Sequence, residues 1–129
     1  MILVDTSVWI EYLQHANPAV GSAMDELLLT SEVATTGLVL AELRRGCRTP
    51  AQTRIMLQAM EPLTYLEAPR AAWLQAGELA MEGAARGHKL ELGDCLLAAI
   101  SMQESCALFT LDQDFRRIPG VVLHRPRIP

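Results

Sequence analysis

The sequence predicts an α/β fold in which helices cover a mainly parallel β-sheet, and three observations lead to this class. Short apolar or β-branched segments alternate with amphipathic segments along all 129 residues. The segments that separate successive apolar runs are too long for hairpin turns, so they suit crossover connections between parallel strands. The chain contains no internal repeat and no low-complexity stretch. We therefore expect a single domain over residues 1–129, which is long enough to bury a core.

The first predicted elements are a buried strand and the helix that follows it. Residues 1–4, MILV, form a continuous apolar run, which is the pattern of a strand covered on both faces. The three residues after this run, Asp5-Thr6-Ser7, offer side chains of the types that commonly cap helix N-termini, so we expect a helix to start here. Four apolar residues then fall on one helical face, namely Val8, Trp9, Tyr12 and Leu13. A strand whose pattern is that of a buried strand is thus followed directly by the charged side chain of Asp5, which requires an explanation.

Two further helices are predicted where a capping side chain precedes a proline. Asn17-Pro18 and Thr49-Pro50 both have this arrangement, because proline fits the first position of a helix. Residues 33–36 are β-prone and form the second predicted strand, which ends at Gly37. Leucines then recur at helical spacing, so we expect another helix that ends near residues 46–48.

The second half of the chain continues this alternation. The predicted elements are a strand over residues 62–66, a helix over 69–85 that Gly87 ends, a helix that follows Gly93-Asp94, a strand over 107–111, a turn or short helix over 112–117 and a last strand over 121–124. Trp9 and Trp73 lie in apolar helical patterns, which favours packing in the core or in an interface over base stacking.

The composition favours a compact cytoplasmic protein. Half of the residues are apolar, and no apolar run reaches the roughly 18 residues of a membrane span. The first residues lack a basic segment and a small-residue cleavage site, so we expect no signal peptide. Cys47, Cys95 and Cys106 show no C-x-x-C spacing. We therefore expect buried, reduced thiols and no contact with membranes.

The basic residues are concentrated in two segments, although the formal net charge is −4. Eight of the 11 Lys and Arg residues lie in stretches without acidic residues, namely Arg44, Arg45, Arg48, Arg54, Arg116, Arg117, Arg125 and Arg127. All eight are arginines, whose planar guanidinium groups suit two-point contacts with phosphate. A solvated face without a ligand is the alternative for such clusters.

Four carboxylates lie where a parallel sheet and its helices would bring them together. Asp5 and Asp112 each follow a predicted strand, and the carboxyl ends of parallel strands face one crevice. Asp94 stands at the start of a helix, where the helix dipole favours negative charge. Glu42 lies in a mostly apolar helical stretch. Taken singly, Asp5 and Asp94 are equally compatible with helix caps, Asp112 with a turn and Glu42 with a solvated helix position.

Taken together, the four carboxylates predict a metal site. Acidic groups at one end of a sheet repel one another unless a cation lies among them. Oxygen ligands suit Mg²⁺ or Mn²⁺, whereas Zn²⁺ usually takes His or Cys, and the three histidines, His15, His88 and His124, show no ligand spacing. Removing these four from the 15 acidic residues leaves 11, which balances the 11 basic residues, so the net charge of −4 equals the charge of the quartet. A rigid buried strand would hold Asp5 in place for such a site.

Four segments of the sequence resemble the PIN domain, and in particular the VapC-type toxins of bacterial toxin–antitoxin pairs. They are, in order, MILVDTSVWIEYL, VLAELRRG, LELGDCLLAAIS and LFTLDQDFRRIPGVVL. The resemblance covers essentially the whole chain and implies a three-layer α/β/α sandwich with a mainly parallel central sheet. By position, the acidic quartet of the family is matched by Asp5, Glu42, Asp94 and Asp112.

The same resemblance implies supporting residues beside the quartet. Thr6 follows the first Asp, and Thr110 matches a hydroxyl residue that supports the site. Asp114 is a second acid in the closing motif, where either acid of such a pair can lie nearest the metal. We expect Asp112 to be the nearer one and Asp114 to support it.

The implied activity is that of a ribonuclease dependent on Mg²⁺ or Mn²⁺. A metal-activated water would leave 5′-phosphate and 3′-hydroxyl ends, because the ribose 2′-hydroxyl is not the nucleophile. The arginines expected to hold RNA phosphates are Arg44, Arg45, Arg48, Arg116 and Arg117. The resemblance also implies two partners, a small VapB-like antitoxin and a second copy of the chain, for which the apolar residues within 18–29 and 50–60 offer surfaces.

Other protein classes whose first strand ends in Asp fit less well. A haloacid-dehalogenase-like phosphatase needs a second Asp two residues after the first, where this chain has Ser7. A response-regulator receiver needs adjacent acids after its first strand and a Lys after its last, but the single lysine, Lys89, precedes Asp94. The remaining alternative is a catalytically degenerate PIN-like subunit that binds or regulates. The sequence does not specify which RNA would be the target.

Overall fold

The centre of the molecule is a four-stranded sheet in the order β3-β2-β1-β4, in which all neighbouring strands are parallel. The computed structural model describes residues 1–126, so Arg127 lies outside the described residues. The strands are β1 (Ile2–Val4), β2 (Val33–Thr36), β3 (Thr64–Leu66) and β4 (Ala107–Phe109). The helices are α1 (Thr6–Leu13), α2 (Pro18–Thr30), α3 (Gly37–Gly46), α4 (Pro50–Met60), α5 (Arg70–Ala85), α6 (Leu92–Gln103) and the 3₁₀ helix η1 (Gln113–Arg117). The predicted α/β class with a parallel sheet is confirmed.

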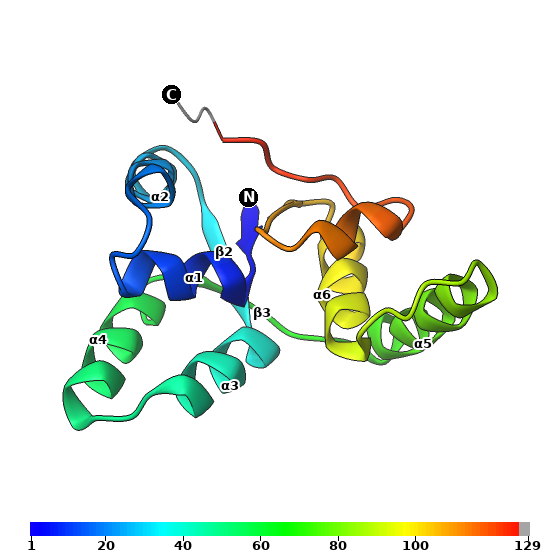
Figure 1. Ribbon diagram of the computed structural model, residues 1–129, viewed down its shortest axis with the longest axis horizontal. Helices are drawn as coiled ribbons and strands as arrows, with labels where there is room; N and C mark the ends of the chain where they lie inside the picture. Colours follow the sequence, from blue (N-terminus) through cyan, green and yellow to red (C-terminus); the bar gives the residue numbers. More distant parts are fainter. Residues whose placement is uncertain (127–129) are drawn as a thin grey trace.

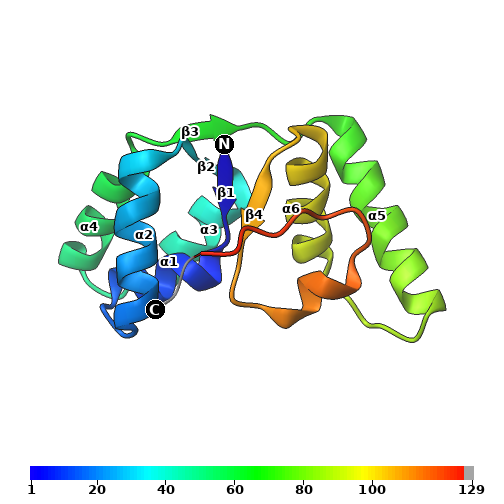
Figure 2. The ribbon, with the colours of Figure 1, turned by 90° about the horizontal axis from the view of Figure 1, so that it is seen from above.

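Helices cover both faces of this sheet. α5 and α6 lie on one side of it, and α1, α2 and α4 lie on the other (Figures 1 and 2). The expected three-layer sandwich is therefore present. Leu3 and Val4 of β1 have no exposed surface, because both faces of the central strand are covered. Among residues 1–126, no helix combines the length and the apolar character that crossing a membrane requires.

The chain changes direction across the sheet beside β1. From β1 it moves outward through β2 to β3, and it then returns to place β4 on the other side of β1. This path puts a topological switch point between β1 and β4, and ligands of parallel α/β sheets bind at the carboxyl ends of the strands at such a point. Asp5 and Thr110 directly follow these two strands.

The predicted helix starts at the two prolines are confirmed. The side chain of Asn17 accepts hydrogen bonds from the backbone N–H groups of Ala19 and Val20, at 3.0 and 3.3 Å. Thr49 Oγ1 accepts from the N–H of Gln52 at 3.1 Å. These bonds satisfy N–H groups that have no partner within a helix, and proline at the first position removes one more such group.

The predicted last strand over residues 121–124 is wrong, because this segment makes a single parallel bridge between Leu108 and Leu123. Its two hydrogen bonds run from the N–H of Leu108 to the carbonyl of Val122 and from the N–H of His124 to the carbonyl of Leu108, both at 2.8 Å. Pro126 follows shortly after and has no N–H with which a longer ladder could continue. Element boundaries also differ from the prediction, since β3 begins at Thr64, β4 ends at Phe109 and α6 begins before Asp94, at Leu92.

The two tryptophans differ in their environments. Trp9 is fully buried, and its ring packs edge-on against Tyr12 with centroids 5.9 Å apart. Trp73 is 57% exposed, so core packing is wrong for this residue. The reason is that α5 turns its small residues inward, with Ala72 and Ala76 fully buried. Packing of Trp73 in an interface stays a prediction.

Candidate active site

The carboxylate of Asp5 is held by two hydroxyl groups at the end of β1. Ser7 Oγ donates to its Oδ2 at 2.8 Å, and Thr110 Oγ1 donates to the same oxygen at 2.7 Å. Asp5 is buried, and its side chain makes no capping bond to α1. Within residues 1–126, no hydrogen bond reaches its other oxygen, Oδ1. Asp5 thus occupies the N-cap position of α1 as the alternative predicts, but its side chain does not cap the helix, and one carboxylate oxygen remains available to a ligand.

The same two hydroxyl groups bind the loop that leaves β4. Ser7 Oγ accepts from the N–H of Leu111 at 3.1 Å, and Thr110 Oγ1 accepts from the N–H of Asp112 at 3.0 Å. Each hydroxyl thus donates to Asp5 and accepts from the loop. The role of Ser7 was missed in the sequence, where it was interpreted as part of a helix start. A hydroxyl two residues after a strand-ending Asp is the signal that would have revealed it.

Glu42 comes to this region on α3. Its Oε1 accepts a hydrogen bond from Thr6 Oγ1 at 2.9 Å, and the Thr6 side chain is buried at the start of α1. Glu42 is half-buried, so it does not occupy a fully solvated helix position. Thr6 therefore supports Glu42, while Thr110 and Ser7 support Asp5.

Asp94 lies in the first turn of α6, and its charge is strongly disfavoured. Burial raises the pKa of its carboxyl to about 7, and the charges of Asp112, Asp5, Glu42 and Asp114 add to this effect in that order. The helix cap position belongs to Glu91, so the cap alternative for Asp94 is wrong. The structure thus brings the other three acidic residues of the predicted quartet, together with Asp114, within electrostatic reach of Asp94.

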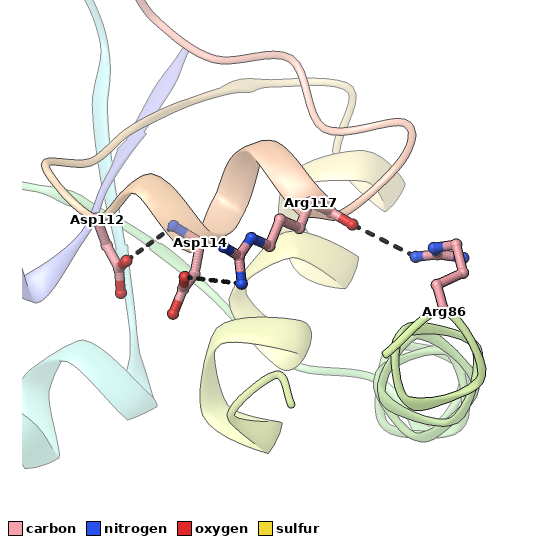
Figure 3. Close-up of polar contacts among 4 residues, drawn as sticks. All are labelled: Arg86, Asp112, Asp114 and Arg117. Carbon is pink, nitrogen blue, oxygen red and sulfur yellow. Dashed lines mark hydrogen bonds and ion pairs between the residues drawn. The ribbon is translucent and has the colours of Figure 1, made fainter. Parts of the chain in front are cut away.

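Asp112 and Asp114 lie at the start of η1, and their carboxylates extend to the same side of it (Figure 3). Asp112 Oδ1 accepts from the N–H of Asp114 at 2.9 Å, so the turn alternative for Asp112 is correct in part. Asp114 Oδ1 lies 3.9 Å from Nη1 of Arg117. The carbonyl of Arg117 in turn accepts from Nη2 of Arg86 at 3.4 Å (Figure 3).

The arginines predicted to bind RNA are divided between two places. Arg44 and Arg45 lie in the last turn of α3, and Arg48 lies in the loop that follows; all three are exposed. Arg116 and Arg117 are in the last turn of η1. Arg117 is engaged with Asp114, which reduces its availability to an external anion.

The acidic side chains are near one another without forming a closed cage. Among residues 1–126, no three or more His, Cys, Asp or Glu side chains are gathered closely enough to hold a metal ion as they stand. Like charges favour separation when no cation lies between them. The donor set around Asp94 consists of carboxylate oxygens, the ligand type that Mg²⁺ and Mn²⁺ prefer.

The family assignment rests on a comparison of the whole chain. The sequence model of the PIN domain family matches residues 2–121. The chain belongs to the PIN domain family. This PIN domain is 30% identical over 127 residues to Ribonuclease VapC5 of Mycobacterium tuberculosis, with 92% of this chain and 87% of the relative covered.

Solved structures share the fold of this PIN domain. VapBC2 of Rickettsia felis, bound to a DNA fragment from its promoter, has a TM-score of 0.81 at 23% identity and covers 96% of this chain and 98% of that one. VapBC-5 of M. tuberculosis has a TM-score of 0.64 at 26% identity, with coverages of 93% and 91%. VapC20 of M. tuberculosis, a Sarcin-Ricin loop cleaving toxin, has a TM-score of 0.72 at 20% identity, with coverages of 97% and 100%.

Proposed function

We propose that this PIN domain is a metal-dependent endoribonuclease and the toxin of a toxin–antitoxin pair. One observation carries the proposal: carboxylates from separate elements meet at the carboxyl edge of the sheet, beside the switch point between β1 and β4. Its similarity to Ribonuclease VapC5 supports the choice of RNA as substrate. The structural similarity to VapBC toxin–antitoxin complexes supports the choice of an antitoxin as partner.

Asp5, Glu42, Asp94 and Asp112 are the residues proposed to hold the metal. When bound to these carboxylates, Mg²⁺ or Mn²⁺ would supply the chemistry of water activation and of charge stabilisation at the phosphodiester. Thr110 and Ser7 fix Asp5 Oδ2 and so direct its Oδ1 away from these hydroxyls, while Thr6 orients Glu42. Such supporting hydrogen bonds commonly orient metal-binding carboxylates.

The remaining proposed roles concern substrate and partners. Arg44, Arg45, Arg48, Arg116 and Arg117 are proposed to contact RNA phosphates, because guanidinium groups pair well with phosphate oxygens. The antitoxin and a second copy of the chain are proposed to use exposed apolar residues, which on α2 and α4 include Leu28, Leu29 and Ile55.

The decisive experiment is cleavage of end-labelled total RNA by the purified chain with Mg²⁺, Mn²⁺ or EDTA. We expect cleavage that needs the metal, leaves 5′-phosphate and 3′-hydroxyl ends, and is lost in Asp5→Asn and Asp94→Asn. Asp25→Asn is the matched control, because Asp25 is exposed on α2 and outside the acidic group. This control should cleave like the wild type.

Two outcomes would contradict the proposal in different ways. Ends with 2′,3′-cyclic phosphate would exclude hydrolysis by water and make the ribose 2′-hydroxyl the nucleophile. A wild-type protein that is folded, free of partners and inert with every metal would instead favour the catalytically degenerate subunit.

A further inference from the structure

An arginine-lined hollow lies between the end of α3 and the outer face of α4, outside the acidic group. Its volume is about 660 Å³, and its walls include Arg44, Arg48 and Arg54. Cys47, Thr53 and Gln58 also line this hollow. We call it the α3–α4 hollow. Only Arg44 and Arg48 of its arginines belong to the set proposed above to bind RNA.

The hollow is positively charged. Glu61 is the acidic residue in its lining, against three arginines. Within residues 1–126, none of these arginines forms an ion pair with a carboxylate, since the salt bridge found there joins Arg117 and Asp114. Three unpaired guanidinium groups around one concavity attract an anion.

The turn that presents these arginines is held in one conformation. The N–H of Arg48 donates to Gln52 Oε1 at 2.7 Å, and Thr49 Oγ1 accepts from the N–H of Gln52 at 3.1 Å. Gln52 takes part in both bonds, which satisfy its own N–H in the first turn of α4 and the N–H of Arg48 before the helix. The anion is therefore attracted by the arginine side chains, and a fixed turn lowers the entropy cost of binding it.

The position of the hollow suits a nucleic-acid strand that passes the acidic group. Glu42 and Arg44 are two residues apart on α3, so the hollow begins roughly one helix width, about 10 Å, from Glu42. Because Glu42 itself lies on α3, an RNA strand held at the acidic edge can continue along this helix toward the hollow. Guanidinium groups bind backbone phosphates in pairs of hydrogen bonds, whatever the base sequence.

We propose that the α3–α4 hollow binds backbone phosphates of the RNA on one side of the cleavage point. This proposal rests on the ribonuclease function proposed above and adds a second point of contact, with Arg54 as a binding residue. The lining favours RNA over an acidic peptide, because it combines three arginines with the polar side chains of Thr49, Thr53 and Gln58, and Leu57 is its one large apolar residue.

The first test measures RNA affinity without cleavage. A fluorescein-labelled 12-nucleotide oligouridylate is titrated in EDTA at several salt concentrations with the wild type and with Arg44→Gln/Arg48→Gln/Arg54→Gln. Three lost phosphate contacts should weaken binding about 10-fold to 100-fold at 0.1 M salt and reduce the slope of log K against log[salt] by about 2. Arg54→Gln alone should reduce the slope by about 0.7.

Arg70→Gln is the control for the loss of positive charge. Arg70 is the first residue of α5. Gln75, in the next turn of α5, accepts a hydrogen bond from Gln103. Gln103 is the last residue of α6, whereas Asp94 lies in the first turn of that helix. Arg70 is thus remote from the acidic edge, and its loss should leave the salt slope unchanged. A triple variant whose affinity and slope match those of Arg70→Gln would overturn the proposal.

Cys47 provides an independent readout inside the hollow. Cys95 and Cys106 are buried, whereas Cys47 is partly exposed in the wall of the hollow. RNA should slow the reaction of Cys47 with N-ethylmaleimide in the wild type and not in the triple variant, as measured by mass spectrometry of the peptides. Equal reaction rates with and without saturating RNA would contradict occupation of the hollow.

The remaining outcomes separate the hollow from the nuclease proposal. If the wild type cleaves RNA but the triple variant binds it equally well, the hollow is not a subsite while the nuclease function stands. If the wild type neither binds nor cleaves RNA, both proposals fail. If polyglutamate protects Cys47 as well as RNA of equal charge does, the hollow serves an acidic protein segment, which overturns the assignment to RNA.

Discussion

Thr110 donates a hydrogen bond to Asp5 Oδ2 over 2.7 Å, although 105 positions separate the two residues in the sequence. The bond joins the ends of β1 and β4 at the switch point of the sheet. Asp5 therefore takes its orientation from a strand that is formed late in the chain, and the proposed metal site depends on a hydroxyl that is not itself acidic.

Replacing Thr110 should weaken metal binding and RNA cleavage. Thr110→Val keeps the shape of the side chain but removes both the donor to Asp5 and the acceptor for the N–H of Asp112. We expect the affinity for Mn²⁺, measured by calorimetry, to fall about 10-fold to 100-fold, as is typical when a residue that orients a metal ligand is lost. Thr110→Ser keeps the hydroxyl and should retain most of the affinity. Equal affinities in the Val and Ser variants would contradict the role of this hydroxyl.

Ser7 should act through the same oxygen of Asp5. Ser7→Ala removes one of two donors to Oδ2, so we expect a smaller loss of Mn²⁺ affinity than in a variant that lacks both. Because Ser7 and Thr110 share one acceptor, the loss in Ser7→Ala/Thr110→Val should differ from the sum of the single losses by about 0.5 kcal/mol or more. Additive losses in this double-mutant cycle would show that the hydroxyls support Asp5 independently.

Asp94 should make the metal-free protein less stable as the pH rises. Its pKa is raised from 3.8 to about 7 in the folded chain, so between these values the folded state holds a proton that the unfolded state has released. The free energy of unfolding contributed by this group therefore falls as the pH increases from about 4 to 7. We expect Asp94→Asn to gain about 1 to 2 kcal/mol at pH 8 in EDTA, allowing for solvent screening of a half-buried group, and little at pH 4.

Urea unfolding at pH 4 and pH 8 measures this difference. Glu78→Gln on the exposed face of α5 is the control, and its effect should stay within about 0.5 kcal/mol at both pH values. A gain in Asp94→Asn that is the same at both pH values would mean that its charge is not the cause.

Two glycines of α5 should respond in opposite directions to alanine. A Cβ at Gly83 would lie 2.6 Å from Leu90 Cδ1 and 3.1 Å from its Cγ, whereas a Cβ at Gly77 meets no atom within 4 Å. Gly77→Ala should therefore gain about 0.5 to 1 kcal/mol from helix propensity. Gly83→Ala should lose about 1 kcal/mol net, because crowding costs about 1 to 3 kcal/mol.

Urea unfolding of the two variants tests this contrast. Since Leu90 precedes the helix that bears Asp94, Gly83→Ala should also reduce RNA cleavage more than Gly77→Ala does. Equal stabilisation by both substitutions would show that Leu90 moves aside without cost.

The elements whose signals are local were predictable from the sequence. Adjacent residues were enough to predict the strand before Asp5, the helices that begin at Asn17-Pro18 and Thr49-Pro50, and the strand over residues 33–36. The segment 121–124 has the same apolar signal, but it pairs with β4 through one bridge and two hydrogen bonds only. Such pairing depends on tertiary position, which the local pattern does not contain.

The candidate site was predictable to the level of its acidic residues. Strand ends and helix starts fix where Asp5, Asp94 and Asp112 lie, so their meeting follows from sheet topology. The hydrogen bonds of Ser7 were not predictable, because its two partners, Asp5 and the N–H of Leu111, meet only after β4 pairs with β1. The catalytic roles of the four carboxylates stay predictions.

The pairing of β1 with β4 has a consequence for the timing of activity during synthesis. A growing chain that has reached the end of α5 contains Asp5 and Glu42 but still lacks Asp94, Asp112 and Thr110. At about 5 to 20 residues per second, the 105 positions from Asp5 to Thr110 take about 5 to 20 s to translate. A ribosome making this protein thus completes nearly all of it before the residues of the proposed nuclease site are all present, so a nascent chain that ends before Asp94 holds only part of that site.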